Sequence, residues 1–134
     1  MFMRTPTAAG LFAIAMTTAG AVSALPVYAE SVDGVFSNRR AAPTLVTFGA
    51  GQNDVFGQTG SLSGVTDRDY FTFVVPAGLG LTSLTVLNSA LTAGGATFLG
   101  LQAGAEVTVD PAAPSAAPLL GYELVSPADI GSDI

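Results

Sequence analysis

The sequence predicts a single all-β domain, an antiparallel β-sandwich of the jelly-roll kind, behind an N-terminal signal peptide. Short runs of aromatic and β-branched residues recur along the chain, and Gly, Pro, Asn and Ser separate them, which is typical of strands and turns. After residue 29, no segment keeps the 3.6-residue period of a helix over ten residues, and no repeat of fixed period is visible. Six or seven short strands in 105 residues are enough for one sandwich core.

The first 29 residues have the layout of a secretory signal peptide. Arg4 lies in a short positive segment, an apolar run covers residues 8–24, and small-x-small exits end at Ala24 and Ala29. We predict cleavage after Ala29, with Ala24 as the second choice, and a secreted or cell-surface location. The alternative is an uncleaved membrane anchor, which needs roughly 20 strongly apolar residues. Threonines and a glycine interrupt the run here, so the sequence favours cleavage.

We expect the central strand of the domain at residues 70–75. Phe71, Phe73 and Val75 fall on one face, and both faces carry apolar bulk. Further strands are predicted at residues 44–48, 55–59, 81–87, Thr97–Gln102, 106–109 and Leu119–Val125. The rest is predicted to be an extended lead-in over residues 30–43, with at most one short edge strand, and loops at residues 49–54, 60–67, 88–95 and 111–118.

The charge balance argues against nucleic acid and lipid as partners. The whole chain carries a net charge of −6, and after cleavage three arginines would face ten acidic residues, which gives −7. A surface of that sign repels phosphate backbones and lacks the basic patch that holds a protein to anionic lipid. We therefore expect no nucleic acid and no stable membrane insertion after signal cleavage.

The residue types that are absent limit the chemistry that the chain can perform. The sequence contains no Cys, no His and no Lys. It therefore has no disulfide, no thiol, imidazole or amine for nucleophilic catalysis, and no His or Cys ligand for zinc or iron. A carboxylate-based glycosidase remains a remote alternative, since such an enzyme also needs a sugar-binding cleft. We predict that the protein is not an enzyme.

Hard-cation binding is the only site chemistry that the sequence suggests. Asp67 and Asp69 lie two residues apart at a loop-to-strand junction, with Asp54 and Asp110 as distant contributors. Calcium takes several oxygen ligands at flexible geometry. We favour the simpler interpretation, in which Asp67 and Asp69 are turn residues that cap backbone amides or pair with Arg68. No cofactor is therefore expected, and calcium is kept as an alternative.

Three further features have a plain structural interpretation. Arg39 and Arg40 form a solvated pair in preference to a processing or contact site. Tyr70 and Tyr122 are expected as half-buried strand residues in preference to a sugar platform, because Tyr is commonly intermediate in burial. The Pro/Ala tract at residues 111–118 is expected to be a stiff surface loop.

The segment DRDYFTFVVPAG at residues 67–78 resembles the core motif of bacterial pre-peptidase C-terminal-like β domains. The later segments LTSL, FLGLQAG, LLGY and DIG, which begin at residues 81, 98, 119 and 129, are similar to a subgroup of exported proteins of the PEP-CTERM sorting type. The resemblance implies a non-catalytic secreted or surface module. Relatives of this kind continue with a Gly-rich, Trp-containing hairpin, so it also implies a chain truncated after Ile134 or a sandwich without one edge.

Three functions agree with these observations. The first is a secreted or cell-surface module that acts by display or binding in an envelope or matrix. The second is a carbohydrate-binding or enzyme-accessory module, which needs exposed aromatic side chains in a row on one sheet face. The third is a calcium-dependent adhesion domain, which needs Asp67 and Asp69 to converge with loop carbonyls. The partner expected is a surface polysaccharide or an envelope protein, and the oligomeric state is left open.

Overall fold

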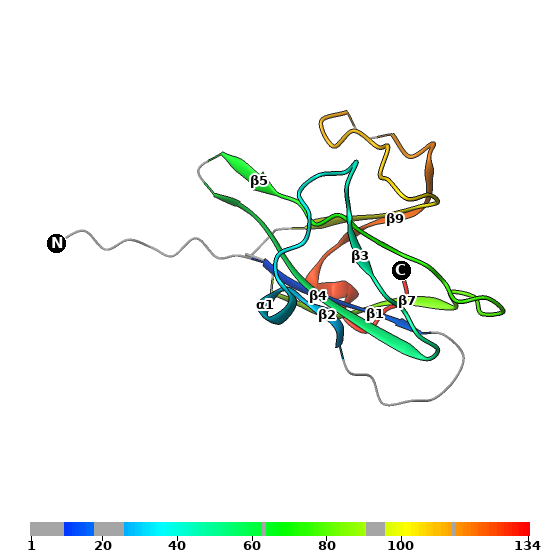
Figure 1. Cartoon of the computed structure of the whole chain (residues 1–134). Helices are drawn as coiled ribbons and strands as arrows, with labels where there is room; N and C mark the ends of the chain where they lie inside the picture. Colours follow the sequence, from blue (N-terminus) through cyan, green and yellow to red (C-terminus); the bar gives the residue numbers. More distant parts are fainter. Residues whose placement is uncertain (1–9, 18–25, 63, 91–95, 114) are drawn as a thin grey trace.

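A computed structural model describes residues 10–17, 26–62, 64–90, 96–113 and 115–134. The main sheet has five strands in the order β2-β4-β1-β7, with β5 paired to β4 off this path (Figure 1). Its strands are β1 (Gly10–Thr17), β2 (Pro26–Ala29), β4 (Gln52–Leu62), β5 (Val65–Asp67) and β7 (Ser83–Ala90). β2 runs parallel to β4, whereas the other pairs of this sheet are antiparallel.

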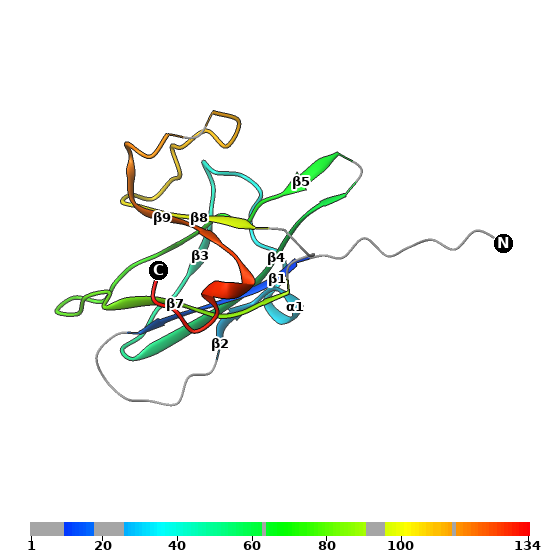
Figure 2. The ribbon, with the colours of Figure 1, turned by 180° about the vertical axis from the view of Figure 1, so that it is seen from behind.

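Two smaller sheets lie beside the main one. β3 (Thr44–Val46) and β6 (Phe71–Phe73) form a parallel pair, and β8 (Thr97–Gln102) and β9 (Leu119–Val125) form an antiparallel pair. Figure 2 shows β8 and β9 side by side next to the main sheet, and β5 projecting from the body of the molecule. The helices are single turns, α1 (Glu30–Asp33) and η1 (Pro127–Asp129). None of the helices in the described ranges has the length and apolarity needed to cross a membrane.

The hydrophobic core joins the main sheet to the β3–β6 pair. Phe36, Val46, Phe48 and Val55 form one buried cluster, to which Val55 contributes from β4 and Val46 from β3. Val55 is completely buried, as expected for the middle of the longest strand. Aromatic rings close the cluster: Phe48 stacks on Phe73 with centroids 4.3 Å apart, and Phe36 stacks on Tyr28 at 4.4 Å. Burial of these rings stabilises the fold.

Several predictions are confirmed. The described chain is mostly β-structure, and the strands predicted at Thr97–Gln102 and Leu119–Val125 form with those bounds. The strand predicted at residues 44–48 forms over Thr44–Val46. Phe71 and Phe73 pack against the core, as expected from their position on one face of the strand. Val74, which was predicted on the other face, is 70% exposed.

The prediction of a central strand at residues 70–75 is wrong. β6 has three residues and pairs only with β3 among the described strands, in parallel. The prediction of purely antiparallel pairing is wrong for the same pair and for β2 with β4. The aromatic residues of β6 cover the core from a small, separate sheet. The local sequence pattern is the same for such a strand and for a central strand, so it does not distinguish the two.

Other differences concern loops and strand lengths. β4 has eleven residues, so it extends well beyond residues 55–59, and residues 60–67, expected as a loop, contribute a hairpin with Gly60 opposite Asp67. β7 continues to Ala90, into residues expected as a loop, whereas residues 91–95 lie outside the described part. Residues 106–109 do not form a strand, and the lead-in contains α1. Of the Pro/Ala tract, the described residues 111–113 and 115–118 lie outside strands and helices, as expected.

The N-terminal segment that the sequence analysis assigns to a signal peptide contributes two strands. β1 lies between β4 and β7, and β2 lies on the other edge of β4. Residues 1–9 and 18–25 lie outside the described residues, so the small-x-small exit that ends at Ala24 is not described, whereas the exit that ends at Ala29 lies in β2.

Candidate functional site

The outer side of the β8–β9 hairpin carries an exposed apolar surface. We define the hairpin face as Phe98, Leu120, Tyr122 and Leu124, which are 49%, 70%, 59% and 60% exposed. Alternation along the two strands places these side chains on one side. The opposite side turns inward, because Val125 is buried and Leu99 packs against the core cluster. The hairpin is therefore held to the molecule by one side and presents the other to solvent.

The register of the hairpin brings two aromatic rings together on this face. Phe98 lies opposite Leu124, and Gly100 lies opposite Tyr122. The Phe98 and Tyr122 rings stack along the diagonal, with centroids 5.9 Å apart and an interplanar angle of 26°. Gly100 makes room for this arrangement, since a Cβ atom at that position would come within 3.1 Å of Cε1 of Phe98. The hairpin face therefore combines an exposed aromatic pair with two exposed leucines on the same side.

An exposed apolar patch of this kind is typical of a binding surface, because water is released when another apolar surface covers it. The sequence analysis missed this site. It predicted both strands but expected Tyr122 to be half-buried, and the structure shows that this expectation is wrong. Tyr70, by contrast, is half-buried, and its carbonyl accepts the backbone N–H of Thr44 at 2.9 Å. The alternation of Leu120, Tyr122 and Leu124 was the available signal, but it does not reveal which side faces water.

Asp69 is the most perturbed titratable group of the described chain. Both of its carboxylate oxygens are buried and have no hydrogen-bond partner. Burial, and then the negative charges of Glu30 and Asp67, raise the pKa of Asp69 to about 7. The prediction that Asp69 caps a backbone amide is therefore wrong. Gly57 of β4 provides the space for this carboxylate, because a Cβ there would lie 2.5 Å from Oδ2 of Asp69.

The neighbouring Glu30 is a connecting residue that the sequence analysis did not single out. Its Oε1 accepts the backbone N–H of Phe36 at 2.5 Å, and its Oε2 accepts the backbone N–H of Gln58 at 2.6 Å. The carboxylate thus joins the segment before the core residue Phe36 to β4. Both oxygens of Glu30 are used in these bonds.

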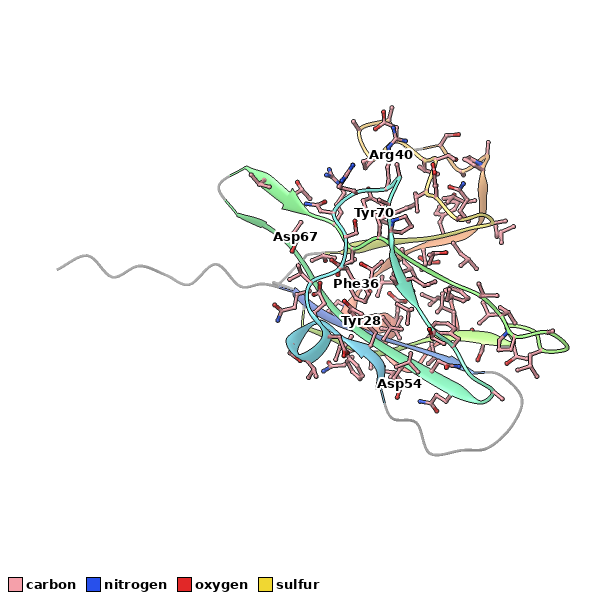
Figure 3. All side chains as sticks on the ribbon, in the orientation of Figure 1. Tyr28, Phe36, Arg40, Asp54, Asp67 and Tyr70 are labelled. Atoms are coloured by element: carbon pink, nitrogen blue, oxygen red, sulfur yellow. The ribbon has the colours of Figure 1, made fainter. Side chains whose placement is uncertain are left out.

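The other carboxylates considered for calcium lie apart. Asp67 ends β5 and is exposed, whereas Asp54 is buried in β4 and accepts a hydrogen bond from Nε2 of Gln52 at 2.8 Å. Figure 3 shows Asp54 and Asp67 in different parts of the molecule. Asp110 lies in a turn, where it accepts the backbone N–H of Ala112 at 2.9 Å. Within the described ranges, no group of three or more acidic side chains is arranged to hold a metal ion.

The arginine pair is divided between two roles. Nη1 of Arg40 donates to the carbonyl of Thr108 at 2.8 Å, and the Arg40 carbonyl accepts the backbone N–H of Val107 at 2.9 Å. Arg40 therefore anchors the segment around the buried Val109, while its side chain stays exposed, as the prediction of a solvated pair expects. Arg39 is exposed. The contact also explains why residues 106–109 form no strand, because the backbone of Val107 pairs with a loop.

Comparisons of the chain with models of protein families, with curated proteins and with solved structures found no match.

Proposed function

We propose that this chain is an exported, non-catalytic β-sandwich module that acts by binding to a component of the bacterial envelope or matrix. The hairpin face carries the proposal: four exposed apolar side chains share one side of a hairpin whose other side is anchored in the core. The signal-peptide layout of the first 29 residues and the resemblance of residues 67–78 to pre-peptidase C-terminal-like domains support export and a non-catalytic role.

The buried carboxylate supports a role without catalysis. Asp69 has the kind of pKa that a general acid or base needs, but its oxygens are buried beneath the Phe36 and Gly57 region and touch no solvent. A catalytic carboxylate must lie within hydrogen-bond reach of its substrate. Asp69 does not meet that condition in this conformation.

The leading target is an apolar protein surface of the envelope. Phe98, Leu120 and Leu124 offer no hydrogen-bonding group on their side chains, and only Tyr122 carries a hydroxyl. Apolar and aromatic side chains of this kind dominate the centres of protein–protein interfaces. A sugar site needs several polar groups that fix the orientation of the ligand.

A carbohydrate-binding or accessory module is the second candidate. The specific observation in its favour is the exposed Phe98–Tyr122 pair, since aromatic rings can pack against the apolar faces of sugar rings. No comparable observation favours the calcium-dependent adhesion domain, because Asp67 is exposed, Asp69 is buried and Asp54 lies elsewhere in β4.

The experiment is a sedimentation assay of the exported protein with the insoluble envelope fraction of the bacterium that expresses it. The double variant Phe98→Ala/Tyr122→Ala removes the ring pair, and we expect at least a tenfold loss of envelope-bound protein. The matched control is Val65→Ala/Val74→Ala, which removes two exposed apolar side chains outside the hairpin face and is expected to bind like the wild type.

Pretreatment of the envelopes identifies the target. Protease digestion is expected to abolish binding, whereas periodate oxidation of sugars is expected to leave it intact. Binding that survives protease and is lost after periodate would indicate a carbohydrate-binding module instead. Equal sedimentation of the wild type and of the hairpin-face variant would contradict the proposal.

A further inference from the structure

β1 occupies the centre of the main sheet. All eight of its residues pair with β4, from Gly10 opposite Thr59 to Thr17 opposite Gln52, and its other edge pairs with β7 from Leu11 onward. Ile14 is aligned with Val55 on one side and with Val86 on the other, and these two valines are 0% and 1% exposed. The best-buried positions of β4 and β7 therefore flank the middle of β1.

The same residues form the apolar run of the signal peptide. Cleavage after Ala24 or after Ala29 removes β1 in either case. β4 and β7 then face each other across a space one strand wide, about 10 Å between their axes, since neighbouring strands lie about 4.8 Å apart. Backbone N–H and C=O groups on both edges lose their partners. Unpaired buried groups of this kind are costly, and exposed ones are a template for another strand.

No other strand of the described chain is free to fill this space. β5 pairs with the last residues of β4, and the second edge of β7 is taken by the segment that contains Ile130 and Asp133, whereas cleavage after Ala29 removes β2 together with β1. β3 pairs with β6, and β8 with β9. The undescribed stretches after residue 25 contain at most five residues each, fewer than the eight of β1. The occupant must come from elsewhere.

We propose that the exported form is a strand acceptor, in which the space between β4 and β7 binds an extended apolar segment of another polypeptide. This inference rests on the proposed export and cleavage. The donor segment lies antiparallel to both strands, spans about the eight residues of β1, and places an aliphatic side chain level with Val55 and Val86, where Ile14 lies. Main-chain hydrogen bonds supply affinity, and the alternate side chains supply selectivity.

The test uses the full chain, expressed without export so that β1 is retained, with a protease recognition sequence substituted into residues 18–25. After cutting, the protein is unfolded in urea and refolded with an excess of a labelled synthetic peptide that has the sequence of residues 8–19. We expect the refolded monomer to carry one label per chain. A peptide with Ala13→Pro, which removes a backbone donor in the middle of the strand, is expected to be incorporated at least tenfold less.

Four results would overturn the proposal. The first is a cut chain that refolds as a monomer and excludes both peptides. The second is equal uptake of the proline peptide, which would show binding without strand pairing. The third is a label-free dimer, which would assign the space to a second copy of this chain. Failure to refold with either peptide would also contradict the proposal, because the wild-type peptide is expected to restore the sheet.

The export proposal is tested separately by the mass of the exported protein. If that mass shows that residues 10–17 are retained, the premise of cleavage fails while the peptide result still reports whether the space accepts a strand. If cleavage occurs and no peptide is incorporated, the strand-acceptor proposal fails while the binding function of the hairpin face is unaffected.

Discussion

Two stacked aromatic pairs in this molecule have opposite surroundings. Phe48 and Phe73 stack with centroids 4.3 Å apart and at 18°, and Phe48 is 5% exposed. Phe98 and Tyr122 stack at 5.9 Å and 26°, and both are about half exposed or more, at 49% and 59%. The first pair lies between the main sheet and the β3–β6 pair, whereas no described element covers the second.

The comparison shows that the apolar alternation of a strand does not determine whether its rings are buried in the core or exposed for binding. In the first pair, Phe48 is buried and Phe73 is partly buried by the rest of the fold, and this burial stabilises the fold. The rings of the second pair leave apolar surface exposed and can contribute their burial only to a complex. Substitutions at the two pairs should therefore separate stability from binding.

The largest effect is expected at the buried pair. Phe48→Ala removes a ring that is 5% exposed and stacked on Phe73, so we expect the free energy of unfolding to fall by about 3–5 kcal/mol. Urea unfolding followed by circular dichroism measures the change. Phe98→Ala is the matched control, and its cost should stay below about 1 kcal/mol, since exposed substitutions are usually small. Equal losses in the two variants would remove the distinction between the pairs.

A smaller loss is expected where β4 passes the buried carboxylate. Gly57→Ala places a methyl group 2.5 Å from Oδ2 of Asp69 and 3.1 Å from the Phe36 ring, so we expect a destabilisation of about 1–3 kcal/mol. Gly60→Ala in the same strand is the control, because nothing lies within 4 Å of its Cβ position. The same urea melts report both variants. A Gly57→Ala protein as stable as the Gly60→Ala protein would show that Asp69 does not lie against β4.

These contacts mark the limit of what the sequence predicted. Thr97–Gln102 and Leu119–Val125 were predicted with their bounds, because their runs are continuous and turn residues flank them. Gly57 interrupts the apolar pattern of β4 in the sequence, and the reason is tertiary, because Gly57 lies against Asp69 and Phe36. β6 was overestimated for the opposite reason, since its aromatic run is strong while its only described strand partner is β3.

The candidate site was predictable only in part. The alternation of Leu120, Tyr122 and Leu124 marks an apolar side of the strand, but exposure depends on which elements pack against the hairpin. The perturbation of Asp69 likewise comes from burial and from Glu30, which is 39 positions earlier in the chain. The position of β1 depends on whether the N-terminal segment is retained, which is a matter of processing.

A pH-dependent effect, smaller again, is expected at Asp69. The folded protein holds the Asp69 proton up to about pH 7, whereas the unfolded chain releases it near pH 4. The folded state therefore binds more protons between these values, and stability falls as the pH rises from about 4 to 7. Asp69→Asn removes this slope and should stabilise the protein at pH 8 by about 1–2 kcal/mol, a figure reduced for the partial exposure of the side chain.

Thermal melts at pH 5 and pH 8 measure this prediction. Glu106→Gln is the control, because it removes one negative charge at an exposed position and should leave the slope unchanged. A wild-type protein whose stability stays constant or rises between pH 5 and pH 7 would contradict the assignment, because the folded state would then not bind the additional proton in that range.

The most direct test of the hairpin face as a binding surface is a variant that changes stability least and binding most. The Phe98→Ala/Tyr122→Ala double variant is measured for its melting temperature and for its sedimentation with bacterial envelopes. We predict a change in unfolding free energy below about 1 kcal/mol, and a loss of binding of at least tenfold. A protein that melts far below the wild type would place these rings among the stabilising residues, and a protein that binds as well as the wild type would show that the hairpin face is not the binding surface.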